Sequence, residues 1–294
     1  MRFLILFLLA IVAIAGPARA GELKHLAANG LDRTYYLHVP KGLPPGAPLV
    51  IMLHGAADEG ERMVRALGWE TLADQEHFIV AGPNATLLHP DRPPGEGNMR
   101  IWNSSAGYYP ASIAAVDDKG FIVALIDEIA RTHAIDRRRV YVAGFSNGGY
   151  LANSLGQQIP DRIAALAAVA GDFTPLVKSL PRGIPVLIVA GDRDYFSPVK
   201  GGKLKMIWGN EFEKESLRQL VDRWRTLDDC PEAKSSAGPH RTRIEISAPC
   251  RDGSEVQYIS MAGVDHQWPT GDPVNLTNVA WNFFKRFSLP APPR

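Results

Sequence analysis

The chain has 294 residues, of which 46% are hydrophobic and 21% are charged, and its formal net charge is +1. This composition is typical of a globular protein and excludes a disordered, collagen-like or coiled-coil chain. Because the net charge is close to zero and no basic run occurs, nothing favours binding to nucleic acid or to an anionic membrane. We therefore expect a small or neutral partner.

Residues 1–20 have the pattern of a secretory signal peptide. A single positive charge precedes an apolar run over 3–15, and the segment ends in the small-residue pattern Ala18-Arg19-Ala20. The apolar run is shorter than the roughly 20 residues that a membrane anchor needs. The sequence therefore predicts cleavage before Gly21, one domain over 21–294, no membrane anchor, and export to the periplasm or the medium.

Short apolar or β-rich runs indicate strands, and segments with helical spacing lie between them. The predicted strands are 33–39, 48–53, 78–81, 140–143, 163–170, 185–190, 242–247 and 255–260. The predicted helices are part of 59–75, then 117–133, 148–158, 211–227 and 274–287. This alternation predicts an α/β fold, with a mostly parallel central sheet covered by helices on both faces.

The segment 87–109 is long, rich in Pro, Gly and Asn, and carries Trp102, Tyr108 and Tyr109. A long irregular segment inside a compact domain is more often functional than idle. We therefore predict that it forms a wall of an active site. The alternative is a surface loop without a functional role.

The run Gly144-Phe145-Ser146-Asn147-Gly148-Gly149 follows a predicted strand directly and precedes a predicted helix. A serine hydroxyl is a weak nucleophile, and a sharp strand-to-helix turn exposes it beside a base and near a helix N-terminus. A bare G-x-S-x-G also occurs by chance, and the alternative is a glycine turn with an ordinary serine. The strand before it and the helix after it favour Ser146 as a nucleophile.

An acid after a later strand and a histidine near the end of the chain should accompany such a serine. The loop Gly191-Asp192-Arg193-Asp194 follows the strand 185–190, and we favour Asp194 over Asp192 because Asp194 lies deeper in the loop. Of the eight histidines, only His266 follows the last predicted strand and precedes the last predicted helix. We predict that it is the general base.

The residues His54-Gly55-Ala56 follow the strand 48–53, at a position where backbone N–H groups can stabilise a developing oxyanion. The expected donors are the N–H of Asn147 and the N–H of Ala56 or Ala57. We expect His54 to shape this loop without transferring protons. No metal-binding pattern or phosphate-binding glycine loop occurs, so we expect neither a metal nor a cofactor.

Both cysteines, Cys230 and Cys250, lie in the part of the chain that we predict to be exported. An even number of cysteines in an oxidising compartment indicates pairing, so we expect one disulfide. The alternative, a catalytic thiol, is disfavoured because neither cysteine lies at a turn directly after a strand.

On these residues the chain resembles the secreted α/β-hydrolase family of polyhydroxybutyrate (PHB) depolymerases, feruloyl esterases and acetylxylan esterases. The resemblance is carried by R-T-Y-Y-L-H-V-P, P-L-V-I-M-L-H-G, V-D-D-K-G-F-I, I-D-R-R-R-V-Y-V-A-G-F-S-N-G-G, P-V-L-I-V-A-G-D-R-D and H-Q-W-P. It implies an α/β-hydrolase fold, ester hydrolysis by a triad of Ser146, Asp194 and His266, and a disulfide just before the histidine. The acid loop departs from the family pattern H-G-x-x-D, because Ala190 stands where the family has histidine.

The resemblance implies a secreted serine esterase that forms an acyl-enzyme, and we expect its substrate to be a hydroxyalkanoate oligomer or polymer. A feruloyl or acetylxylan esterase is the first alternative, for which Trp102, Tyr108, Tyr109 and Trp268 are candidates to stack on ferulate or sugar. A serine peptidase of the prolyl-oligopeptidase kind and a non-catalytic binding protein are the others. The length leaves no room for the β-propeller usual in such peptidases, and the three triad residue types argue against the binding protein.

Overall fold

A single ten-stranded sheet organises the chain, which we describe from a computed structural model over 21–89, 91–95, 97–104, 110–171, 177–205, 211–271 and 274–291. The predicted signal peptide lies outside these residues. The strands of this sheet are β1 (Glu22–Ala28), β2 (Leu31–His38), β3 (Ala47–Leu53), β4 (Ile79–Pro83), β7 (Ile135–Phe145), β8 (Ala165–Val169), β9 (Val186–Gly191), β12 (Lys234–Ala237), β13 (Thr242–Ser247) and β14 (Val256–Met261).

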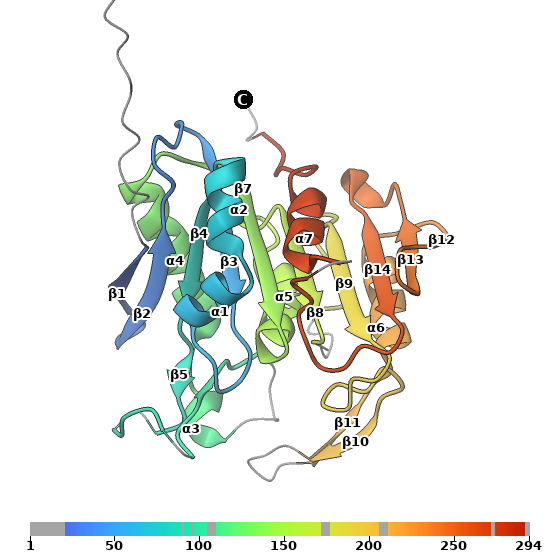
Figure 1. Cartoon of the computed structure of the whole chain (residues 1–294), viewed down its shortest axis with the longest axis horizontal. Helices are drawn as coiled ribbons and strands as arrows, with labels where there is room; N and C mark the ends of the chain where they lie inside the picture. The colour runs from blue at the N-terminus through green and yellow to red at the C-terminus, as the bar shows by residue number, and fades with distance from the viewer. Residues whose placement is uncertain are drawn as a thin grey trace, which may run out of the picture.

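The order of the strands across the sheet is β1-β2-β4-β3-β7-β8-β9-β14-β13-β12 (Figure 1). The six strands from β4 to β14 run parallel to one another. The strands β1 and β2 at one edge and β12 and β13 at the other are antiparallel to their neighbours. The predicted α/β class with a mostly parallel sheet is therefore confirmed.

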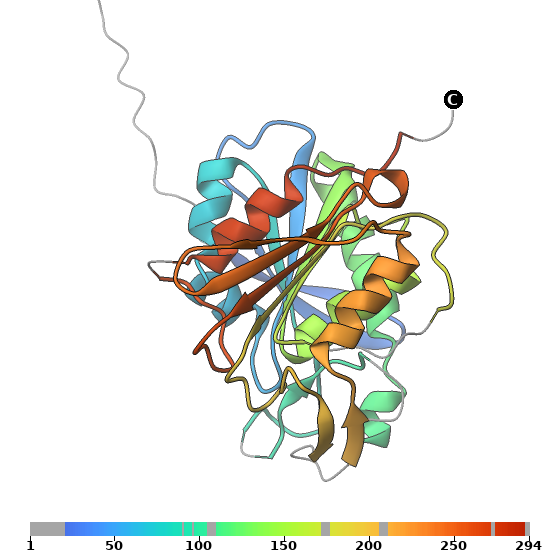
Figure 2. The same ribbon diagram turned by 90° about the vertical axis from the view of Figure 1, so that its right-hand side faces the viewer.

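Helices cover both faces of the sheet, and Figure 2 shows the two helical layers on opposite sides of the strands. The helices are α1 (Gly60–Ala66), α2 (Trp69–Glu76), α3 (Ala111–Ala114), α4 (Asp118–Thr132), α5 (Asn147–Gln158), α6 (Leu217–Leu227) and α7 (Leu276–Phe284), with a short 3₁₀ turn at Arg251–Gly253. Side chains of α4, α5 and α6 pack in one core cluster, and those of α1, α2 and α7 pack in the other. No helix in the described part of the chain is long and apolar enough to cross a membrane.

Strands β3, β4, β8 and β9 carry no charged or amide side chain and are buried along their whole length, because successive side chains point to opposite faces of a sheet that is covered on both sides. In β3, Leu49 and Ile51 belong to the cluster of α4, α5 and α6, whereas Val50 and Met52 belong to the cluster of α1, α2 and α7. A continuous apolar run in the sequence thus marks a strand that is buried along its whole length, and in β7 only the later part, 140–144, has this character.

The structure differs from the predictions at three places: two predicted helices are divided, and one strand was not predicted. The predicted helix over 211–227 contains instead β11 (Glu211–Lys214), which pairs with β10 (Gly202–Lys205), and only then α6. Helix α6 begins after Ser216, because the Ser216 side chain and the Gln219 side chain each bond the other residue's backbone N–H in a capping box.

The second and third differences lie nearer the N-terminus. The polar stretch before residue 33 forms the edge strand β1, which pairs with β2. The predicted helix within 59–75 is divided into α1 and α2 at Gly68, whose φ of 76° is left-handed. The segment 87–109 contributes to two short paired strands, β5 (Thr86–Leu87) and β6 (Arg100–Ile101).

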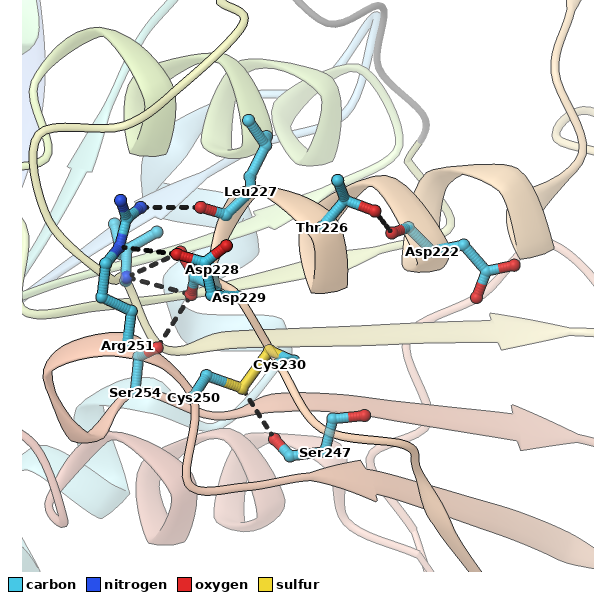
Figure 3. The surroundings of a disulfide bond; sticks show 11 residues. Asp222, Thr226, Leu227, Asp228, Asp229, Cys230, Ser247, Cys250, Arg251 and Ser254 are labelled. Atoms are coloured by element: carbon cyan, nitrogen blue, oxygen red, sulfur yellow. Dashed lines mark hydrogen bonds and ion pairs between the residues drawn. A yellow bond between two sulfur atoms is a disulfide. The ribbon is translucent and has the colours of Figure 1, made fainter.

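Cys230 and Cys250 form a disulfide that joins the chain after α6 to the chain after β13 (Figure 3). Beside it lies Asp228, which accepts hydrogen bonds from the backbone N–H of Ile184 and from the hydroxyl of Ser254. Burial raises the pKa of Asp228 to about 7. The disulfide and these hydrogen bonds together fix the end of α6 against the sheet.

Replacing both cysteines by serine (C230S/C250S) should lower the free energy of unfolding by roughly 3 kcal/mol, because the disulfide restricts the unfolded chain. Urea denaturation followed by circular dichroism measures this difference. Dithiothreitol should move the wild-type midpoint toward that of the variant and leave the variant unchanged. Equal unfolding free energies for the oxidised wild type and the variant would contradict the prediction.

Candidate active site

Ser146 lies at the turn between β7 and α5 in a conformation that residues other than glycine rarely adopt. Its φ is 53° and its ψ is −120°. Its backbone N–H donates to the carbonyl of Val169 in β8, at 2.8 Å. The turn is therefore anchored to the sheet while Ser146 stands at the amino end of α5, where the helix dipole favours negative charge.

The glycines around Ser146 allow the turn to pack against its neighbours. A Cβ atom at Gly144 would lie 2.1 Å from the carbonyl oxygen of Gly148, and one at Gly148 would lie 2.2 Å from the carbonyl oxygen of Leu53. Both separations are far below van der Waals contact with backbone atoms that cannot easily move. Only glycine at these two positions lets β7 and α5 meet at so sharp a turn beside β3.

The three predicted triad side chains lie within hydrogen-bond distance of one another. His266 Nε2 is 2.9 Å from Ser146 Oγ, and His266 Nδ1 is 2.7 Å from Asp194 Oδ2. They come from the turn after β7, the loop after β9 and the loop after β14. With the ring proton on Nδ1, facing the carboxylate, Nε2 is left to accept the serine proton.

The structure also separates the two candidate acids. The side chain of Asp194 is fully buried, and its second oxygen, Oδ1, accepts the backbone N–H of Ser197 at 2.7 Å. Asp192 is exposed, and its Oδ1 accepts the backbone N–H of Gly263 at 2.6 Å. Asp192 therefore joins the two loops, while Asp194 is the carboxylate that faces the imidazole of His266.

His54 is a buried neutral residue at the start of the loop after β3. Its Nδ1 lies 2.6 Å from the carbonyl oxygen of Gly55, and its Nε2 lies 3.0 Å from the backbone nitrogen of Ala85. Nδ1 therefore carries the proton and Nε2 accepts one. Burial lowers the pKa of His54 to about 3. These contacts agree with the expectation that His54 shapes the loop and transfers no proton.

The loop after β3 lies directly beside Ser146. A Cβ atom placed on Gly55 would lie 3.4 Å from the Cβ atom of Ser146. The N–H of Ala57 donates to the carbonyl of Arg100 at 3.0 Å. Because this N–H is already bonded, it is not a candidate donor to the oxyanion. Ala56 is then the candidate donor on this loop.

Asn147, the other candidate donor, is the first residue of α5. Its side chain bonds the backbone of Trp102 twice: Oδ1 accepts from the Trp102 N–H at 2.7 Å, and Nδ2 donates to the Trp102 carbonyl at 3.2 Å. The described part of the segment 87–109 thus holds two parts of the candidate site in place. The Trp102 backbone bonds the Asn147 side chain, and the Arg100 carbonyl accepts the N–H of Ala57 on the loop after β3.

Two of the predicted substrate-binding aromatic residues are core residues instead. Trp102 is fully buried and its indole Nε1 donates to the carbonyl of His54 at 2.9 Å. Trp268 is buried and its Nε1 donates to the hydroxyl of Thr277 at 3.0 Å. The prediction that they stack on substrate is wrong for this structure, because a ring without an open face cannot stack on a ligand. The other two, Tyr108 and Tyr109, lie outside the described residues.

Two exposed aromatic residues that were not among the predicted site residues, Tyr195 and Phe196, lie on the loop after Asp194. Tyr195 is 74% exposed and Phe196 is 55% exposed, and the centroids of their rings are 4.2 Å apart. The ring of Phe196 lies 5.2 Å from that of His266. The signal was available, because the two residues follow Asp194 directly.

Comparison with known proteins gives a consistent result. A family model described as Esterase PHB depolymerase matches residues 33–194. The chain is 23% identical over 270 residues to a bifunctional acetylxylan esterase/xylanase of Neocallimastix patriciarum, covering 90% of this chain and 35% of that protein. It is 25% identical over 269 residues to poly(3-hydroxyalkanoate) depolymerase C of Paucimonas lemoignei, covering 84% and 61%. The chain thus spans less than two thirds of either relative.

Among solved structures, an acetyl xylan esterase from Aspergillus awamori is similar, with a TM-score of 0.64 and 17% sequence identity. The match covers 90% of this chain and 99% of that one. At this identity the likeness establishes the fold, which is the α/β-hydrolase fold, and nothing about substrate.

The environment of His54 predicts that its imidazole stays neutral, with the proton on Nδ1, from pH 5 to pH 9. In the unfolded chain a histidine takes up a proton below about pH 6.5, so this residue makes the fold less stable as the pH falls toward 5. Two-dimensional ¹⁵N NMR of the imidazole nitrogens measures tautomer and charge. A titration midpoint above pH 5 would contradict the assignment.

Proposed function

Since the chain belongs to the PHB depolymerase family of esterases, we propose that it hydrolyses carboxylic esters with Ser146 as nucleophile, His266 as general base and Asp194 as the acid that orients the base. The observation that carries the proposal is the continuous hydrogen-bonded chain Asp194–His266–Ser146, with separations of 2.7 Å and 2.9 Å. The turn that exposes Ser146, in which this residue has a φ of 53°, also supports the proposal.

In the first half of the proposed reaction, Ser146 Oγ attacks the ester carbonyl carbon and His266 Nε2 takes the serine proton. The carbonyl oxygen becomes an oxyanion, for which the N–H groups of Ala56 and Asn147 are the proposed donors. When the carbon–oxygen bond to the alcohol breaks, His266 returns the proton to the leaving oxygen. The products of this half are the free alcohol and an acyl group on Ser146.

In the second half, water takes the place of the alcohol. His266 removes a proton from the water, whose oxygen attacks the acyl carbon, and the same proton then goes to Ser146 Oγ as the acid is released. Asp194 stabilises the positively charged imidazole that exists in each half. Because its carboxylate is buried and also bonded to the Ser197 N–H, it holds the ring in one orientation throughout.

We propose a hydroxyalkanoate ester as the substrate, with an acetylated polysaccharide as the second candidate. The first is the substrate class in the name of the Paucimonas relative, and the second is a substrate class in the name of the Neocallimastix relative. Release of acid from hydroxybutyrate oligomers, acetylated xylan and methyl ferulate, measured side by side, tests the choice. Preferred release from the xylan would overturn the first candidate.

We also propose that the protein is exported, as the signal-peptide pattern of residues 1–20 suggests. The disulfide between Cys230 and Cys250 supports this, because disulfides persist in oxidising compartments. Intact mass spectrometry of the protein from the periplasm or medium should give a chain that begins at Gly21 and lacks two hydrogens. A reduced, full-length chain confined to the cytoplasm would contradict the proposal.

Ser146→Ala and Asp194→Asn should each lower kcat on p-nitrophenyl butyrate, the first by about 10⁴-fold or more and the second by about 10³- to 10⁴-fold. Asp192→Asn is the matched control and should keep kcat within about threefold, because Asp192 bonds a backbone N–H rather than the imidazole. Circular dichroism checks that each variant is folded. If the D192N loss equals the D194N loss, the assignment of the acid is wrong.

A further inference from the structure

We infer that Tyr195 and Phe196 form the binding surface for the alcohol half of the ester, and that this half is a flexible, largely apolar chain, such as the methyl- and methylene-bearing chain of a hydroxyalkanoate, rather than a sugar. The inference rests on the proposed esterase function and adds a substrate class to it. The two rings are among the few large hydrophobic side chains exposed in the described part of the chain. The Phe196 ring lies beside the imidazole that the proposed mechanism uses, and the Tyr195 ring packs against that of Phe196.

The chemistry of ester cleavage fixes which half of the substrate these rings face. The leaving alcohol oxygen receives its proton from His266 Nε2, so it must come within hydrogen-bond reach of that nitrogen. The carbonyl oxygen points instead toward the proposed N–H donors of Ala56 and Asn147. Two aromatic rings lie near the His266 ring, that of Phe145 at 4.9 Å and that of Phe196 at 5.2 Å. Phe145 is half-buried and Phe196 is exposed, so a group that extends from the alcohol oxygen past the imidazole into solvent can contact Phe196 and then Tyr195.

The loop that carries the rings is held at several points. The Ser197 N–H donates to Asp194 Oδ1, and the buried Lys214 donates its Nζ to the Pro198 carbonyl at 2.6 Å. The Val199 carbonyl accepts the N–H of Leu217 at the start of α6, at 2.9 Å. The rings are therefore presented on an anchored loop, so a ligand gains contact without first having to order it.

The shape and polarity of the pair favour an apolar chain over a sugar. The two ring planes are inclined by 37°, so one face of a rigid sugar ring can lie against only one of them. A flexible chain of methylene and methyl groups can follow both rings. The segment 195–199 reads Tyr-Phe-Ser-Pro-Val, and its side-chain polar groups are two hydroxyls. Each methylene that leaves water on binding favours the complex, so chain length should affect binding measurably.

The test compares two series of esters by pH-stat titration. One series varies the alcohol, with methyl, butyl and hexyl acetate, and the other varies the acid, with methyl acetate, butyrate and hexanoate. Acetylated xylan provides a sugar alcohol. The variants are Tyr195→Ala/Phe196→Ala and, as a control, Leu23→Ala, which removes a side chain that is also 55% exposed but lies on the edge strand β1.

The wild-type kcat/KM should rise with the length of the alcohol. The double variant should lose about tenfold or more on hexyl acetate and progressively less on butyl and methyl acetate, while its dependence on acid length parallels that of the wild type. L23A should match the wild type on every ester. A loss that follows acid length, an equal loss on all esters, or a loss larger on acetylated xylan than on hexyl acetate would overturn the inference.

A pH profile and the wild-type activity itself distinguish a binding role of the two rings from other causes of a lower kcat/KM. Because Phe196 contacts His266, the pH profile of kcat/KM on methyl acetate is recorded for Phe196→Ala. An unchanged midpoint supports a binding role, and a shifted midpoint shows that the ring positions the imidazole instead, which overturns the inference. If the wild type hydrolyses no ester, the proposed function fails and the inference with it. Hydrolysis without any effect of alcohol length overturns the inference alone.

Discussion

The left-handed backbone of Ser146 is the constraint on which the site depends. Such a conformation costs about 1 to 3 kcal/mol for a residue with a side chain, and it persists only where the surroundings enforce it. Here the surroundings are the hydrogen bond to Val169 and the close approach of Gly144 to Gly148 and of Gly148 to Leu53. A relaxed turn would remove the hydroxyl from the reach of His266 without changing any side chain of the triad.

The parallel sheet brings the remaining parts to the same place. Strands β3, β7, β9 and β14 run in the same direction, so their carboxyl ends share one edge of the sheet. The loop with Ala56, the turn with Ser146, the loop with Asp194 and the loop with His266 each follow one of these strands. Residues that are far apart in the sequence therefore meet because the strands that precede them are neighbours, or nearly so, in the sheet.

Most local patterns in the sequence predict the structure correctly, whereas features that depend on distant contacts are not predicted. The apolar run 48–53 marks β3, and the order of Ser146, Asp194 and His266 marks a triad that the hydrogen bonds are consistent with. The burial of Trp102 depends on a bond to the His54 carbonyl, 48 residues away, which no local pattern reveals. The boundary between β11 and α6 was missed although the capping box at Ser216 is a local signal.

The acid and the two exposed rings occupy three consecutive positions, 194 to 196, on one anchored loop. With the roles proposed above, selectivity and turnover depend on the same short loop. Transplanting the loop from a relative would carry along the carboxylate whose placement the imidazole requires, and a change of loop length there would displace both. Substituting Tyr195 and Phe196 on the existing backbone would change the proposed alcohol-binding surface and leave the loop that holds Asp194 intact.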